Sequence, residues 1–369
     1  MCERGPSQDF GSLGTIPLER LQLAADLHGL GRVLGTEFLG GTYGNNVGIA
    51  TENGEWVLRG AIVPIESEAL RRERFFARVV HEQSSIASPW PYLIDESCTI
   101  FGWPFALMRR LPGKVLRPAL DVNWAVIGRA LGQAAAQLHG IHFPRAGEWR
   151  ADLDDIGSPE VSATEWFERR VADLKQRIAH TSSTLDATSA ALVDRLVAGA
   201  VPAIGEFEPI YVHGDLGIGN LTGERTSHGF KFTGVFDLGG GFAGDPDEDL
   251  ATPIWWPLYW GNKAASRAFL DSYRIQSPPR PGQASRLRAY VVVSMLANWE
   301  LGRRRASPGM ASPKGSVTGP YRCWTRWTRL SAEHYRLIEL QLLCCCFSAS
   351  TPSQTQWWTA AGPRKLAAA

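Results

Sequence analysis

The amino-acid sequence predicts an α+β protein of two lobes: a small antiparallel sheet with a helix, followed by a larger, mostly helical part. Short apolar segments with strand-like alternation fill much of the first 110 residues, and Asn53-Gly54 is a strong hairpin signal between two of them. Leu111-Pro112-Gly113 then breaks the pattern, and beyond it apolar residues recur mainly at helical spacing. We therefore divide the chain into an N-terminal lobe (1–110), a C-terminal lobe (111–306) and a tail (307–369).

Two helices and five strands are expected in the N-terminal lobe. The first helix spans Pro17–Leu30, and its expected apolar stripe consists of Leu18, Leu21, Leu23, Ala25 and Leu27. Ser67 is expected to cap the second helix, because a small hydroxyl residue before a periodic apolar run is a common helix start. The five expected strands are Val33–Leu39, Val47–Thr51, Trp56–Arg59, Tyr92–Cys98 and Pro104–Met108.

The C-terminal lobe shows helical periodicity, interrupted by a short strand-rich stretch from Pro209 to Asp237. No internal repeat divides it further. Its expected helices are Trp124–His139, Glu165–His180, Thr188–Val197, Asp247–Tyr259, Lys263–Tyr273 and Ser285–Arg304.

The composition is that of a globular protein, with 44% hydrophobic and 20% charged residues. The formal net charge of +1 gives no indication of a nucleic-acid partner. No apolar run approaches the roughly 18–20 residues that span a bilayer, and the N-terminus lacks the apolar stretch of a signal peptide. Six cysteines, three of them in the run Cys344–Cys346, show neither a disulfide framework nor zinc-ligand spacing. We therefore expect a reduced, cytoplasmic chain without a membrane partner.

The tail differs from the rest of the chain because only Ser331–Leu343 has helical periodicity. From Leu301 onward, ten Lys and Arg residues face only two acids, so the residues before Leu301 have a net charge of −7. An acidic main body suits a cationic substrate, although an ordinary solvated surface has the same composition. The last residues, Lys365–Ala369, resemble a cloning-vector linker. We expect the part beyond about Phe347 to be dispensable.

The strongest functional signal is a loop that follows an expected strand ending at His213. It places Asp215 and Asn220 five positions apart, and Asp237 ends the next hairpin 17 residues after Asn220. Phosphoryl transfer requires a carboxylate that orients and deprotonates the attacking hydroxyl, and oxygen ligands for Mg²⁺. Each motif alone also fits an ordinary turn or a helix cap. Together they predict Asp215 as catalytic base and Asn220 and Asp237 as metal ligands.

This loop resembles that of the aminoglycoside phosphotransferase family, small-molecule kinases with a two-lobed, protein-kinase-like fold. The family pattern His-x-Asp-x-x-x-x-Asn is matched by His213, Asp215 and Asn220, and the family's metal-binding Asp is matched by Asp237. The resemblance covers roughly residues 30–305. It implies that ATP and Mg²⁺ are the cofactors and that His213 supports the loop instead of acting as a base.

A second family pattern, Gly-Asp-x-x-x-Asp, is matched by Gly244, Asp245 and Asp249. The resemblance implies a supporting role for Asp245. Asp237 is followed almost at once by this motif, which leaves no room for the peptide-binding activation segment of protein kinases. We therefore expect a small-molecule substrate.

The N-terminal lobe is expected to bind ATP. Gly-rich residues would cover the phosphates with their backbone N–H groups, although the same sequence fits a plain hairpin tip. Kinases carry a Lys on the third strand that pairs with a Glu on the next helix, and here Arg59 and Glu73 take these places. The strand and hinge segment that includes Met108 is expected to bind adenine through its backbone. The phosphate-loop residues expected to contact ATP are Gly41, Thr42, Gly44 and Asn45.

Acidic and aromatic residues directly after Gly244 are candidates for substrate contacts, because carboxylates suit ammonium groups and aromatic faces suit sugars or cations. The alternative for each residue is helix core or a helix N-terminal charge bias. The segment also resembles hygromycin B phosphotransferases, which favours an aminoglycoside or aminocyclitol antibiotic. The expected substrate-binding residues are Asp249, Trp256 and Tyr259.

Two alternatives remain open at the level of the sequence. A kinase for a macrolide, or for a metabolite such as a sugar, a choline-like amine or homoserine, would share all the core residues. A nucleotide-binding pseudokinase is suggested by Arg59 and by the unusual tail. The intact set of Asp215, Asn220 and Asp237 argues against the pseudokinase.

Overall fold

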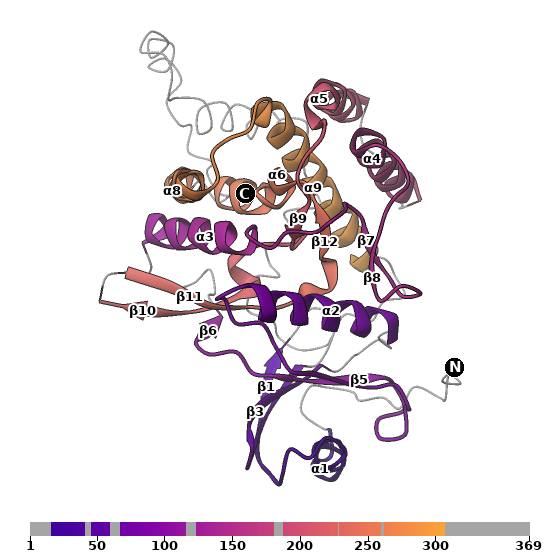
Figure 1. Cartoon of the computed structure of the whole chain (residues 1–369), viewed down its shortest axis with the longest axis vertical. Helices are drawn as coiled ribbons and strands as arrows, with labels where there is room; N and C mark the ends of the chain where they lie inside the picture. The colour runs from indigo at the N-terminus through magenta and orange to yellow at the C-terminus, as the bar shows by residue number, and fades with distance from the viewer. Residues whose placement is uncertain are drawn as a thin grey trace, which may run out of the picture.

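The computed structural model describes residues 16–40, 46–59, 67–115, 123–180, 187–227, 229–259 and 262–306. The expected phosphate-loop residues Gly41, Thr42, Gly44 and Asn45 therefore lie outside the described residues. The tail after residue 306, with its expected helix and its cysteine run, lies outside them as well. Figure 1 shows the described chain as a small sheet lobe below a larger lobe of helices. This confirms the predicted two-lobed α+β architecture.

The small lobe is built on a five-stranded antiparallel sheet with the order β1-β2-β3-β5-β4. The predicted hairpin is present: Thr51 pairs with Gly54, so Glu52 and Asn53 form the turn between β2 and β3. Gly54 has φ of +123°, a conformation that a side chain would strain. The strand bounds are β1 Val33–Gly40, β2 Asn46–Thr51, β3 Gly54–Arg59, β4 Tyr92–Asp95 and β5 Phe105–Arg109.

Helices α1 (Leu18–Leu27) and α2 (Ser67–Gln83) cover the two faces of this sheet (Figure 1). The predicted apolar stripe of α1 was right for Leu21 and Ala25 and wrong for the other three leucines. Those three are more than half exposed, and the helix packs through its small alanines and Leu21. The exposed side chains are Leu18, Leu23 and Leu27, and the buried ones are Leu21, Ala24 and Ala25.

The chain leaves β5 through Leu111-Pro112-Gly113 and enters β6 (Lys114–Val115), which pairs with β10 in the large lobe. The expected division at residue 110 thus falls between strands of two different sheets. β10 (Leu221–Thr226) and β11 (Gly229–Val235) form a hairpin, while β9 (Ile210–Val212) pairs with β12 (Phe242–Gly244) and β7 (Glu148–Arg150) with β8 (Asp155–Gly157).

The large lobe is mainly helical. Glycines in α3 allow it to lie very close to α8: a Cβ on Gly132 would lie 2.9 Å from the Tyr273 nitrogen. The expected helix Asp247–Tyr259 is present as two shorter helices that meet at Leu250. The helices are α3 Trp124–Leu138, α4 Ala163–Ala179, α5 Ala187–Ile204, α6 Pro246–Asp249, α7 Ala251–Tyr259, α8 Lys263–Gln276 and α9 Gln283–Ala306.

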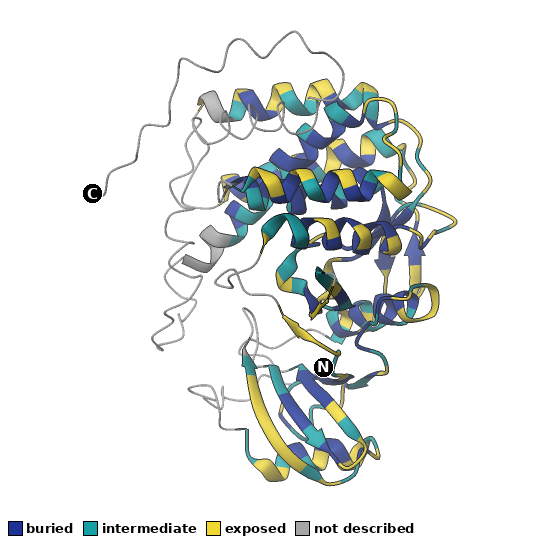
Figure 2. Cartoon of the chain, turned by 90° about the vertical axis from the view of Figure 1, so that its left-hand side faces the viewer, coloured by how far each residue is buried: buried dark blue, intermediate teal, exposed yellow. Residues whose placement is uncertain are grey.

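One hydrophobic core joins the two lobes through α2. Phe76 of α2 and Met108 of β5 belong to the same buried cluster as Leu138, Tyr211 and Trp255 of the large lobe. Figure 2 shows buried residues throughout the helical lobe and on the inner strands of the small sheet, beside an exposed edge strand. Because burial of such residues stabilises by about 1.5–3 kcal/mol each, this shared core holds the lobes together.

Cys98 is disulfide-bonded, which corrects the expectation that the cysteines are reduced. Among the helices of the described ranges, none is long and apolar enough to cross a membrane.

Candidate active site

The loop after β9 carries Asp215, and it turns at Gly214, whose φ is +79°. A Cβ on Gly214 would lie 2.7 Å from the carbonyl oxygen of Gly240, which is closer than side-chain carbons come to such atoms. Gly214 therefore allows this loop to pass next to the segment that follows Asp237. The local requirement for glycine explains how two distant motifs come together.

Asn220 holds the carboxylate of Asp215. Its amide nitrogen donates to Oδ2 of Asp215 over 3.0 Å and to the Asp215 backbone carbonyl over 2.9 Å. The residue Asp215 as a whole is exposed, but many protein atoms lie around its carboxylate and partly desolvate it. This desolvation raises the pKa of Asp215 to about 6, while the hydrogen bond from Asn220 opposes the shift.

Asp237 is brought to Asn220 by the backbone. The amide of Phe236 donates to the carbonyl oxygen of Asn220 over 3.0 Å. Asp237 itself adopts a left-handed conformation, with φ of 61° and ψ of 51°, before the short helix η2 (Leu238–Gly240). Non-glycine residues in this conformation carry strain and concentrate at functional sites. The strained backbone therefore marks Asp237 as a candidate functional residue.

His213 and Asp249 support the loop from below. His213 is fully buried; one ring nitrogen lies 3.0 Å from the Phe236 carbonyl, and the other accepts from the Asp215 amide over 3.3 Å. The carboxylate of Asp249 accepts from the backbone amides of His213, at 2.9 Å, and Gly214, at 3.1 Å. Buried carboxylates that accept backbone N–H groups fix the position of a loop.

Arg59 of β3 connects the small lobe to this loop. Its Nε lies 3.0 Å from Oε2 of Glu73, and its Nη2 donates to Oδ1 of Asp237 over 3.1 Å. The carboxylate of Glu73, and more weakly that of Asp237, raise the pKa of Arg59, so the guanidinium stays charged. Tyr92 donates its hydroxyl to Glu73 over 3.1 Å. The expected pairing of Arg59 with Glu73 is present in the structure.

Met108 lies on β5, where it pairs with Val57 of β3 and Tyr92 of β4, and its side chain is buried. Its partner Val57 lies two residues before Arg59 on β3. The adenine contact expected of the Met108 segment stays a prediction.

The expected substrate residues lie in different places. Asp249 is only 3% exposed and its oxygens are occupied by the loop amides and by His139, so it faces the loop from inside the protein. Trp256 is half-buried and contacts Trp255 edge to face, with centroids 5.2 Å apart. Tyr259 ends α7, and its side chain lies outside the described residues.

Asp245 caps α6 and is buried, in agreement with a supporting role: its Oδ1 accepts from the Asp247 amide over 2.9 Å. Burial and the neighbouring Asp247 raise the pKa of Asp245 to about 6.

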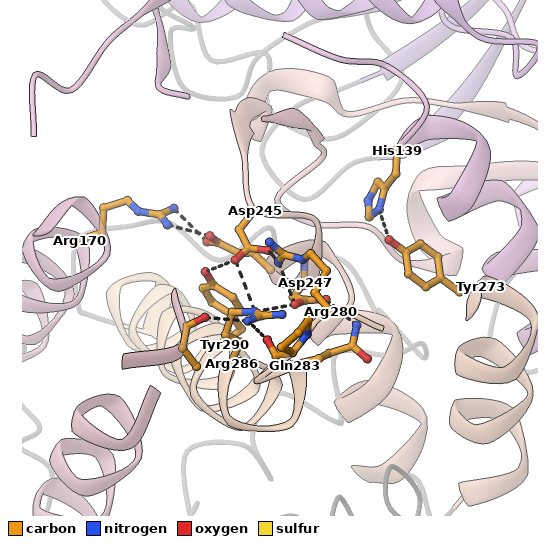
Figure 3. A network of polar contacts seen from close by, with 12 residues as sticks. His139, Arg170, Asp245, Asp247, Tyr273, Arg280, Gln283, Arg286 and Tyr290 are labelled. Carbon is orange, nitrogen blue, oxygen red and sulfur yellow. Dashed lines mark hydrogen bonds and ion pairs between the residues drawn. The ribbon is translucent and has the colours of Figure 1, made fainter. Parts of the chain in front are cut away.

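Sequence reasoning missed the partners of these buried acids. His139, Tyr273, Arg280 and Arg286 come from three separate segments, and no local pattern marks them as polar members of a core (Figure 3). The sequence offers one signal for such a partner: Arg286 is a charged residue at the start of an apolar helix.

Together the fold and this loop arrangement define a small-molecule phosphotransferase that uses a hydroxyl group as acceptor. The chain belongs to the Phosphotransferase enzyme family, whose sequence model matches residues 35–283. No curated protein matches the sequence.

Solved structures share the fold at low sequence identity. An aminoglycoside 2'-phosphotransferase-IIIa in complex with GDP is 15% identical, with a TM-score of 0.61 over 89% of this chain and 99% of that one. A thermostable mutant of aminoglycoside phosphotransferase APH(4)-Ia, in a ternary complex with ADP and hygromycin B, is 16% identical, with a TM-score of 0.56 over 89% of this chain and 99% of that one. The macrolide 2'-phosphotransferase MphH from Brachybacterium faecium is 19% identical, with a TM-score of 0.50 over 88% and 98%.

Proposed function

We propose that the chain transfers the γ-phosphoryl group of ATP, with Mg²⁺, to a hydroxyl group of an aminoglycoside or aminocyclitol antibiotic. The observation that carries the proposal is the convergence of Asp215, Asn220 and Asp237 on one point between the lobes. Asn220 bonds to Asp215 through its side chain and to Phe236, next to Asp237, through its backbone.

The residues present fit Mg²⁺. The side-chain nitrogen of Asn220 donates to Asp215. The side-chain oxygen of Asn220 is therefore the atom that would bind the ion. Arg59 bonds to Oδ1 of Asp237, and Oδ2 is the remaining oxygen of that exposed carboxylate. Within the described part of the chain, no three His, Cys, Asp or Glu residues form a metal cage. Mg²⁺ is normally held by one or two side chains together with phosphates and water. Once bound, the ion would neutralise charge on those phosphates.

Asp215 would accept the proton of the substrate hydroxyl. Its Oδ2 is held by Asn220, so Oδ1 is the atom that can face the acceptor. A pKa of about 6 leaves the carboxylate mostly ionised near neutral pH and makes it a stronger base than an ordinary Asp. Arg59 would hold Asp237 and extend positive charge toward the phosphates of ATP.

The substrate class rests on two observations. Solved relatives of the same fold carry kanamycin, in one complex, and hygromycin B, in another. In this chain, a methyl group of Thr252 lies next to Gly217, two residues after Asp215, and Trp256 follows one helical turn later on the same face of α7. An indole so placed can form a wall for a sugar or aminocyclitol ring.

The test is a panel of acceptors incubated with Mg²⁺ and ATP, in which ADP release and the mass of the phosphorylated product are measured. The panel contains hygromycin B, kanamycin, a macrolide, choline and homoserine, with the Asp215→Asn variant as control. We expect product with at least one aminoglycoside, and formation of that product at least about a hundredfold slower with the variant. Product with the macrolide or a metabolite alone would refute the substrate class, and no product at all would refute the proposal as a whole.

A further inference from the structure

Helix α6 and its cap hold three buried acids, Asp245, Asp247 and Asp249, spaced two residues apart. They are 2%, 2% and 3% exposed. Buried carboxylates are costly unless each one is paired or accepts hydrogen bonds. Three of them in a four-residue helix and its cap therefore require partners from the neighbouring elements, and those partners fix the position of the helix.

The first two acids are bound by the start of α9 and the turn before it (Figure 3). Asp247 accepts from Arg286 Nε and Gln283 Nε2, both over 2.7 Å, and from Arg280 over 3.0 Å. Asp245 pairs with Arg280 and accepts from the hydroxyl of Tyr290 over 3.2 Å. Two guanidinium groups thus balance two carboxylates.

Arg286 is itself rigidly held. Its Nη1 donates to the carbonyl oxygens of Ala203, at the end of α5, and of Pro281, both over 2.7 Å. Its side chain is only 3% exposed. Gln283 accepts from Arg274 of α8 over 2.8 Å. Through these contacts, Arg286 and Gln283 connect α6 to helices α5, α8 and α9.

The third acid acts at the other end of α6. Asp249 accepts from the backbone amides of His213 and Gly214, and Gly214 directly precedes Asp215. His139 lies 3.3 Å from Asp249 and 2.9 Å from the hydroxyl of Tyr273. The short helix is thus fixed at one end by arginines and holds the loop at the other.

We infer that Arg286, with Arg280, is a positioning residue for Asp215 and acts through α6 and Asp249. The inference rests on the proposed phosphotransferase function, but its main residue, Arg286, is buried inside the protein. A misplacement of about 1 Å at a reacting group can cost about a hundredfold in rate, so a loosened α6 affects turnover before it affects binding.

The experiment compares Arg286→Lys with a matched control, Arg170→Lys. Lysine keeps the charge of Arg286 but cannot reproduce bonds to Asp247, Ala203 and Pro281 together. Arg170 makes a two-bond ion pair with Glu248, also on α6, at 2.9 and 2.7 Å. Among the described residues, the carboxylate of Glu248 bonds to Arg170 and not to the loop of Asp215, so the control disturbs the same helix outside the proposed connection.

The first readout is hydrogen–deuterium exchange of the peptide that covers His213 and Gly214, which requires no substrate. We expect exchange to be at least about tenfold faster in Arg286→Lys and unchanged in Arg170→Lys. If Arg286→Lys does not fold, Tyr290→Phe removes only the hydroxyl bonded to Asp245, and we expect an increase of up to about fivefold. Unchanged exchange in these variants, or equal loosening in the control, would overturn the inference.

The second readout is kinetic. We expect kcat of Arg286→Lys to fall by about ten- to a hundredfold, with the KM for ATP within about twofold of wild type. In an Asp215→Asn background the same change should have almost no further effect, because the residue it positions is already lost. Additive losses in the double variant would contradict the inference. The exchange readout keeps this test separate from the substrate proposal, since a wrong acceptor leaves exchange untouched.

Discussion

Arg59 and Asp237, 178 residues apart in the sequence, are joined by an ion pair of 3.1 Å. The same guanidinium lies 3.0 Å from Glu73. Arg59 of the small lobe therefore pairs both with Glu73 of α2 and with Asp237, the proposed metal ligand of the large lobe. The planar fork of arginine allows this double contact, whereas the single ammonium group of lysine would have to share one point charge between both acids.

Arg59→Ala is expected to raise the KM for ATP by about tenfold or more and to change the KM for the acceptor little, because the guanidinium lies beside Asp237 and not beside α7. Arg59→Lys should give an intermediate value, since it keeps the charge but loses one contact. Steady-state kinetics with each substrate varied in turn provide the measurement. A nucleotide-bound structure in which Arg59 points into solvent would refute the prediction.

Asp215→Ala is expected to lower kcat by about 10²–10⁴-fold with ATP affinity nearly intact, because it removes only the base. Asp237→Ala should instead weaken the binding of ATP in the presence of Mg²⁺, with little effect when the nucleotide is added with a chelator. Calorimetric titration and single-turnover assays separate the two outcomes. Near wild-type turnover of Asp215→Ala on a true substrate would disprove the assignment of the base.

The pH profile should report the raised pKa of Asp215. The folded-state pKa of about 6 lies above the ordinary value of 3.8, and the base works only when deprotonated. The rate should therefore be constant above about pH 6 and fall by about tenfold per pH unit below it. Asn220 stabilises the ionised form, so Asn220→Ala should move the acid limb to higher pH. An acid limb near the ordinary Asp value would count against desolvation of this carboxylate.

The contact between α3 and α8 gives a prediction about stability. A Cβ on Gly132 would lie 2.9 Å from the Tyr273 nitrogen and closer still to the Phe269 carbonyl oxygen. Gly132→Ala should therefore destabilise by about 1–3 kcal/mol through overpacking. Gly199 of α5 has open space around its Cβ position, so Gly199→Ala should stabilise by up to about 1 kcal/mol. Thermal unfolding of both variants provides the comparison, and equal shifts would contradict it.

Local sequence predicted most of the secondary structure. The second helix was expected after a cap at Ser67, and α2 spans Ser67–Gln83 with Ser67 as its first helical residue instead of its cap. The helix itself was predictable because apolar residues at helical spacing bury one face whatever they pack against. The β2–β3 hairpin was predicted equally well, since its turn depends on two adjacent residues. The loop of Asp215 and Asn220 was recognisable because its chemistry is concentrated in six consecutive residues.

The positions of isolated acids could not be predicted in this way. Asp249 was expected to face a cationic substrate, yet it lies under the loop and holds the His213 and Gly214 amides. A carboxylate that binds a substrate and one that binds a backbone look the same in the sequence. Only the path of the chain around them decides which donors they meet.

The sequence by itself therefore determined the elements, the two lobes and the residues available for phosphoryl transfer, because periodicity, turns and short motifs are local properties. The tertiary structure decided that Arg59 reaches Asp237, that Leu23 of α1 faces solvent, and that Arg286 balances Asp247. These relationships join segments that are far apart along the chain. They follow from how layers pack and from the need to compensate each buried charge, which no stretch of local sequence records.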